Sequence, residues 1–403
     1  MSTPFPRTPS PSRGGLLAGA LPSLLLGACL AAWPFPAAAA DVPPSLFSTY
    51  PSWCDERSLE HALARGADVN ETLPNGTTVL DMVLANGDAD DVTVTVRLLL
   101  DHGARTGSGE CSPALALTRL VAGGATPEEL DAAMKAMGGR PGSLRLANGF
   151  TPYLWAAALS PSYRHLQVFH ANGTPVDEAL PAAPDAHRET GDDALAIAAM
   201  SNTSTDVARG LSQVLPLNSH SEQHLERSPL MLACALNPSL EVAQTLMEMG
   251  ARVEASDIRL NTAFLLAAAR PGASKLLEGL ASRGADIEVQ NSDEETALVL
   301  AARVNPDVAV IRTLVGLDVP DDAIALSGDN ALTAAVRSNP SPEVIRELLA
   351  TGLVAEVHLG EEDRPVLATI DARRRAWLEE QGLLAAIEKQ AEAPAGKDGD
   401  KKD

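Results

Sequence analysis

The sequence predicts an all-α solenoid, in which pairs of short helices stack one on another along the chain. One apolar pattern recurs at residues 228–234, 262–268, 296–302 and 330–336, so each copy begins 34 residues after the last. A second apolar stretch at helical spacing follows each copy, and in three copies a glycine stands 22 residues after the start. A fixed period of this length is typical of repeat arrays, whose units bury their apolar faces only against neighbouring units.

The first helix of each repeat has a recognisable beginning. Its expected N-cap is a residue whose side chain can accept a hydrogen bond from the amides of the first helical turn. Pro229 suits the first helical position, where no amide hydrogen is needed. Small residues follow, which let neighbouring repeats approach closely. We therefore expect first helices to start directly after Ser228, Thr262, Thr296 and Asn330.

The second helix is marked at both ends. Asn-Pro pairs at 237–238, 305–306 and 339–340 end the first helix, because proline disfavours helical geometry in the residue before it. The Ser or Asp after each pair is the expected cap of the second helix. That helix should close at a left-handed residue, a role that glycine fills best. The candidates are Gly250, Gly284 and Gly352, with Asp318 at the equivalent position of the repeat that begins at Thr296.

Residues 228–353 resemble ankyrin repeats. The resemblance rests on Ser-Pro-Leu at the cap, paired alanines in the first helix, paired leucines in the second, and Gly-Ala-Asp-Ile at residues 284–287. No histidine follows the Pro-Leu, so the hydrogen bond usually made by that side chain is absent. The resemblance implies helix-turn-helix units with projecting loops in a curved array. With weaker copies near Thr78, Ser112 and Thr151, we expect about nine units, some degenerate, across residues 53–388.

The two ends of the chain differ from the repeats. Residues 1–40 contain two arginines, no acid, an apolar run and a small-residue site, which predicts a signal peptide cleaved after Ala40. Residues 26–29 also resemble a bacterial lipoprotein box with Cys29 as its lipid anchor, but the sequence stays apolar beyond Cys29, which favours cleavage after Ala40. Either alternative predicts export, with the periplasm as destination. We expect an extended lead-in at 41–52 and a disordered tail at 389–403.

Composition and motifs exclude several classes of function. The net charge of −22 opposes nucleic-acid binding, which needs clustered Lys and Arg. The same charge would attract a basic partner, although acids that merely solvate the repeats would give the same value. Phosphate loops, nucleophile elbows and zinc-protease motifs are absent from the sequence, so we expect no enzyme activity and no cofactor. His220 and His224 lack a third ligand at metal spacing, so no metal is expected.

The cysteines divide into two kinds. Cys234 occupies the position held by Ala268 and Ala302, which predicts a small buried core residue. Cys54 and Cys111 lie in early repeats, and an exported chain allows a disulfide between them. The sequence leaves it open whether that bond forms.

The resemblance implies protein binding, with contacts at the loop tips and the inner face of the first helices. We expect a non-catalytic scaffold in the bacterial periplasm or cell envelope that holds or neutralises another exported protein. The alternatives are a secreted effector that acts on host proteins, and an enzyme hidden in the longer loops near 176–189 and 217–226. Carried over by position, the binding residues are Glu254, Asp257, Glu288, Gln290, Asn291, Asp293 and Glu294.

Overall fold

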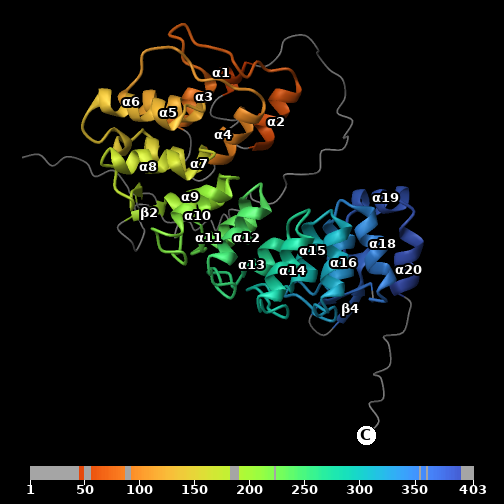
Figure 1. Ribbon diagram of the computed structural model, residues 1–403. Coiled ribbons are helices and arrows are strands. Elements are labelled where there is room, and N and C mark those ends of the chain that lie inside the picture. Colours follow the sequence, from red (N-terminus) through yellow and green to blue (C-terminus); the bar gives the residue numbers. More distant parts are fainter. Residues whose placement is uncertain are drawn as a thin grey trace, which may run out of the picture.

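A computed structural model describes residues 45–49, 56–86, 92–181, 190–221, 224–353, 355–359 and 362–391. In these residues the chain forms stacked pairs of short helices, together with two short antiparallel hairpins (Figure 1). The expected all-α solenoid is confirmed. Among the described helices, none is long and apolar enough to cross a membrane.

Two rows of helices run along the array. The first helices of the pairs are α3 (Val79–Asn86), α5 (Pro113–Ala122), α7 (Pro152–Leu159), α9 (Ala194–Ser201), α11 (Pro229–Leu236), α13 (Ala263–Ala268), α15 (Ala297–Val304) and α17 (Ala331–Ser338). The second helices are α4 (Val92–Asp101), α6 (Pro127–Met137), α8 (Tyr163–Ala171), α10 (Thr205–Leu211), α12 (Leu240–Glu248), α14 (Ser274–Ser282), α16 (Val308–Gly316) and α18 (Pro342–Ala350).

Shorter elements complete the ends and the longer connections. The N-terminal end carries α1 (Leu46–Thr49) and α2 (Glu56–Ala64). Strands β1 (Ala179–Pro181) and β2 (Thr190–Asp193) pair before α9, and the 3-10 turn η1 (Pro141–Ser143) precedes α7. The C-terminal end consists of β3 (Glu356–Leu359), β4 (Glu362–Pro365), the 3-10 turn η2 (Val366–Ala368), α19 (Ala372–Glu380) and α20 (Leu384–Ala391).

The predicted ends of the first helices are confirmed. Each expected cap of a first helix accepts a hydrogen bond from the backbone amide three residues on, as Ser228 does from Met231. Among the expected caps of the second helices, Ser341 accepts from Val344 and Asp307 accepts from Ala309, whereas the Ser239 side chain accepts no such bond. The three closing glycines have φ of +98°, +86° and +85°, and Asp318 has φ +57°. The left-handed residue at the end of the second helix is therefore kept even in the repeat that lacks glycine.

Burial follows the two rows. The first helices pack side by side, and from α7 to α17 most of their residues are buried. Cys234 is 0% exposed, as its position predicted. The second helices bury one face only, such as Val344, Ile345 and Leu348 of α18. In Figure 1 the array bends between α8 and α13, and α4 packs against α9, where Arg97 Nη2 donates to the carbonyl of Ser201 at 3.0 Å.

A side chain from one repeat completes the hydrogen bonding of the repeat before it. Asn339 Nδ2 donates to the carbonyl oxygens of Ala302 and Asn305, at 2.8 Å each. Ala302 needs this donor because Pro306, four positions later, has no amide hydrogen for the helical bond. The carbonyl groups left without a helical donor by one Asn-Pro pair are therefore hydrogen-bonded by the asparagine of the next Asn-Pro pair.

Two arginines take the same role where the asparagine is missing. Arg270 Nη1 donates to the carbonyl of Cys234 at 3.2 Å, and Arg374 Nε donates to that of Val336 at 2.7 Å. Both carbonyls again lie four residues before a proline. The hydrogen bonds of Arg374 to the carbonyls of Val336 and Ala335 hold the terminal unit onto α17. The Arg374 guanidinium also lies 4.2 Å from the centroid of the Trp377 ring on its own helix.

The chain ends differ in part from expectation. Residues 46–49 of the predicted extended lead-in form a helical turn, because Leu46 is fully buried and its amide donates to Glu71 at 3.1 Å. At the other end α20 runs to Ala391, so residues 389–391 are helical rather than part of a tail. The predicted signal peptide at 1–40, Cys29, Cys54 and the rest of the tail lie outside the described residues.

Candidate functional site

Three loops between successive repeats project from the array as one row. We call residues 250–261, 284–295 and 318–329 the loop edge. Each loop ends in the same tight turn, closed by a backbone hydrogen bond of 2.9 to 3.1 Å. The turns run from Asp257 to Asn261, from Asn291 to Glu295 and from Ala325 to Asp329.

Backbone hydrogen bonds also join each turn to the turn before it. The amide of Ser292 donates to the carbonyl of Arg259 at 2.8 Å, and the amide of Leu326 donates to that of Asp293 at 2.9 Å. The amide of Ile258 donates in the same way to Leu225 at 3.0 Å. Because each loop is fixed to its neighbour, the tips keep a constant spacing.

Two of the expected binding residues point inward. Asp257 is 3% exposed, and its carboxylate accepts from the amides of Arg259 and Asn261 and pairs with Arg227 at 3.1 Å. Asn291 is 8% exposed and donates to Glu295 at 3.1 Å. These side chains hold the turns and lie out of a partner's reach, so we leave Asp257 and Asn291 out of the proposed surface.

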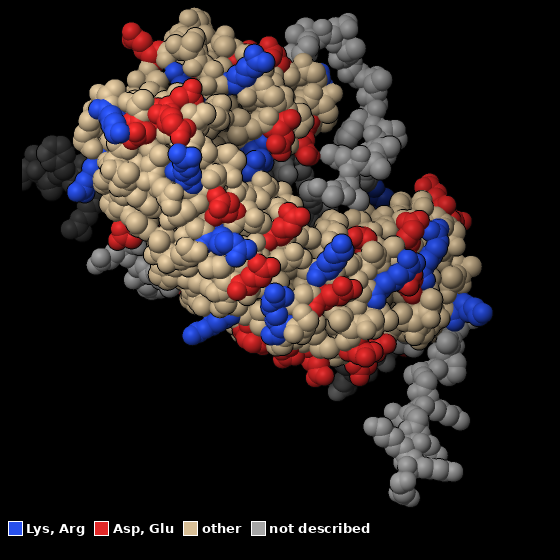
Figure 2. All heavy atoms as spheres, in the orientation of Figure 1, with Lys and Arg blue, Asp and Glu red and all other residues tan. Residues whose placement is uncertain are grey.

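The other expected residues are exposed, and the exposed carboxylates of the loop edge share one property. Within the described residues none of the exposed carboxylates of the loop edge forms an ion pair, whereas the buried Asp257, Glu295 and Asp329 each pair with an arginine. Several exposed acids on the second helices do form ion pairs, as Glu347 does with Arg312 at 2.8 Å. In Figure 2 acids gather along the lower edge beneath α13–α16, while blue and red alternate over the helices above. The exposed side chains are Glu254, Asp286, Glu288, Gln290, Asp293, Glu294, Asp318, Asp321 and Asp322.

Exposed aliphatic residues at the tips were missed by the sequence analysis. Leu326, Ile258 and Leu260 are 65%, 64% and 53% exposed, the highest values for large hydrophobic side chains in the described chain. Ile258 and Leu326 occupy equivalent turn positions, two repeats apart, with Ser292 between them. Aligning the repeats by their 34-residue period could have identified these residues, because it places them at the tip of the turn, where no core position lies.

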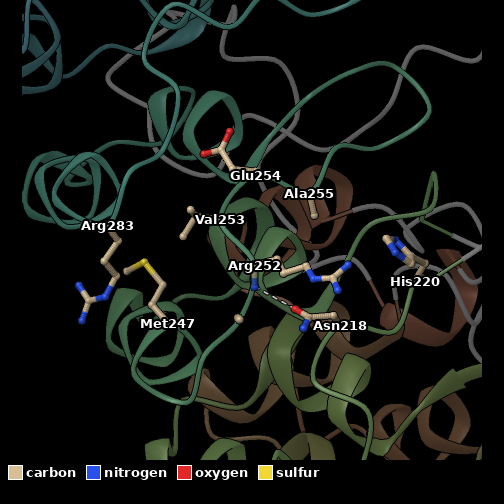
Figure 3. Close-up of a pocket in the computed structure, with 9 residues that line it drawn as sticks. Asn218, His220, Met247, Arg252, Val253, Glu254, Ala255 and Arg283 are labelled. Carbon is tan, nitrogen blue, oxygen red and sulfur yellow. Dashed lines mark hydrogen bonds between the residues drawn. The ribbon is translucent and has the colours of Figure 1, made fainter.

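A groove of about 800 Å³ lies beside the first loop (Figure 3). Met247, Val253 and Ala255 give it apolar walls, and Asn218 Oδ1 accepts from the amide of Arg252 at 2.9 Å. Figure 3 shows the side chains of Arg252 and Arg283 pointing to opposite sides, so they do not converge on one anion. The groove can accommodate an apolar part of a partner, but it presents no arrangement for catalysis.

The longer loop at 217–226 shows one grouping that superficially suggests chemistry. His224 Nε2 lies 3.2 Å from Asp192 Oδ2, and both residues are buried. The Ser221 hydroxyl accepts from the backbone amide of His224, not from its ring, so the three residues do not form a nucleophile and base pair. Across the described residues, no group of three or more His, Cys, Asp or Glu side chains could hold a metal ion.

The sequence leaves open a disulfide between Cys54 and Cys111, and the structure does not decide the question. Cys111 is exposed, and its sulfur lies 3.3 Å from Arg119 Nη1. Cys54 lies outside the described residues, so the structure does not test whether the two cysteines pair.

Stacked helix pairs with a row of tied, projecting loops define a helical repeat protein of the solenoid class. Residues 264–358 match the family model of ankyrin repeats in three copies, so this part of the chain consists of ankyrin repeats. Such repeats are protein–protein interaction modules, and proteins built from them are generally non-catalytic binding scaffolds. No curated protein matches the chain in sequence.

Proposed function

We propose that this protein is a non-catalytic scaffold of the bacterial periplasm or cell envelope, which holds or neutralises another exported protein. The partner contacts the loop edge, and its own contact surface is basic. The export part of the proposal rests on the composition of residues 1–40 and the apolar run within them.

The observation that carries the proposal is the row of unpaired carboxylates. Charges on a protein surface gain little from an exposed ion pair, yet Glu248, Glu343 and Glu347 on the second helices each have an arginine partner. In the part of the chain that the structure describes, the exposed acids on consecutive loops of the loop edge have no such partners. Like charges held together repel one another, and a basic partner would remove that repulsion and be steered toward the edge.

The test is affinity capture from the envelope and culture-fluid fractions of the native organism, with mass spectrometry of the bound proteins. The variant carries Glu288→Ser, Asp293→Ser and Glu294→Ser. A matched control carries Glu248→Ser, Glu343→Ser and Glu347→Ser, which removes the same charge from the second helices. We expect the variant to lose a stoichiometric partner that the control and the unaltered protein retain at low salt.

Retention of the partner by the loop-edge variant would refute the proposed surface. Loss of the partner from both variants would show that binding depends on the net charge of the protein and not on the loop edge. A partner of host origin, with the protein itself in culture fluid, would replace the periplasmic scaffold by the secreted effector.

A further inference from the structure

The exposed aliphatic side chains of the loop edge suggest what kind of partner it takes. Soluble proteins expose single apolar residues freely, but the most exposed ones rarely gather at one feature. Here the three highest exposures all fall on the tips of two loops, at Ile258, Leu260 and Leu326, with Ile324 also 39% exposed. The loop between them carries Ser292, Asp293 and Glu294 at the same positions. The edge is therefore apolar at two ends and acidic in the middle.

The spacing of this pattern follows from the backbone. Each loop contributes two chain segments, and hydrogen-bonded segments lie about 4.8 Å apart, so one repeat spans about 10 Å. This matches the distance of about 8–10 Å between packed helices. Ile258 and Leu326, two repeats apart, therefore lie about 20 Å from each other. An extended chain covers that distance in about six residues.

Charge decides among possible occupants. Arg252 and Arg259 are the two cations of the loop edge, and its carboxylates outnumber them. An anionic lipid surface or a nucleic acid would be repelled by these carboxylates. A peptide segment with Lys or Arg between two apolar residues places its cations at Asp293 and Glu294 and its apolar side chains at the two outer tips.

We infer that the loop edge binds an extended, basic segment of its partner, with two large apolar residues about six positions apart and Lys or Arg between them. This rests on the proposed function and specifies its partner. The apolar residues pack on Ile258 with Leu260 and on Leu326 with Ile324.

The backbone at Leu260 gives a sharp way to test this. Leu260 has φ +59°, a left-handed conformation that side chains with a Cβ rarely adopt, and the equivalent residue of the third loop is Gly328. Leu260→Gly therefore removes an exposed side chain and relieves backbone strain at once. Binding should weaken while the fold becomes no less stable.

The probe is the fluorescein-labelled peptide Leu-Ser-Lys-Lys-Lys-Ser-Leu between short Gly-Ser flanks, measured by fluorescence anisotropy against the full chain. One control peptide has serine for both leucines, and another has glutamate for the lysines. We expect each control peptide, and the variants Leu260→Gly and Leu326→Ser, to bind at least about tenfold more weakly. Val214→Ser, at a side chain 49% exposed away from the loop edge, should bind as the unaltered protein does.

The urea midpoint of Leu260→Gly should equal or exceed that of the unaltered chain. Three results would overturn the inference: the unaltered protein binds all three peptides equally well, it does not bind the leucine–lysine peptide, or Leu260→Gly and Leu326→Ser bind that peptide as tightly as the unaltered protein does. The proposed function would survive each of these outcomes if the native partner is still lost from the triple acid variant.

Discussion

Replacing Asn339 by alanine removes one link between neighbouring repeats without touching the apolar core. The side chain is 0% exposed, and its amide donates to two buried carbonyls at 2.8 Å each. The carbonyl of Ala302 has no other helical donor, because Pro306 lacks an amide hydrogen. An orphaned buried group costs about 1–3 kcal/mol, so two of them cost about 2–4 kcal/mol after partial relaxation.

The measurement is urea unfolding together with amide hydrogen exchange of α15–α18. With a denaturant slope of about 2 kcal/mol per molar, the midpoint should fall by about 1–2 M. Hydrogen exchange is needed because a repeat array can unfold unit by unit, which breaks two-state analysis. The matched control is Asn75→Ala in an exposed turn, expected within about 0.5 kcal/mol of the unaltered protein. If both variants unfold alike, the link between repeats does not contribute to stability as argued.

Three further predictions concern the last unit, the cysteines and one partly buried acid. Arg374→Ala should speed amide exchange in α19 and α20, since it frees the carbonyls of the preceding repeat, while the exposed Arg375→Ala should not. Iodoacetamide at about pH 8 after reduction should label exposed Cys111 and spare Cys234, because burial raises the pKa of Cys234 to about 12; labelling of both in the native state would contradict this. Burial raises the pKa of Asp193, which caps α9, so its stabilising contribution is present at low pH and lost as pH rises through that pKa. Asp193→Asn keeps the cap and should flatten the fall in Tm as the pH rises above about 4; an unchanged profile would argue against this cause.

The candidate site was only partly predictable from the sequence. Position in the repeat correctly indicated exposed acids such as Glu288 and Glu294. It could not separate them from Asp257, because the burial of that carboxylate depends on Arg227, which comes from the preceding repeat. It also missed Ile258 and Leu260, since an apolar residue in a loop is read as core until the packing is known.

What the sequence by itself determined is local. The N-caps at Ser228 and Thr262 and the closing glycines each depend on residues within one helix length, and each appears in the structure as predicted. The 34-residue period is the recurrence of these local signals along the chain. Which side chains join one repeat to the next is known only from the tertiary structure. The exchange of asparagine for Arg270 and Arg374 in that role is an example, because any donor of sufficient reach can satisfy a carbonyl orphaned by proline. The asparagines recur in the 34-residue register, but the carbonyls that they satisfy lie in the preceding repeat, so the sequence pattern does not show this contact or its replacement by arginine.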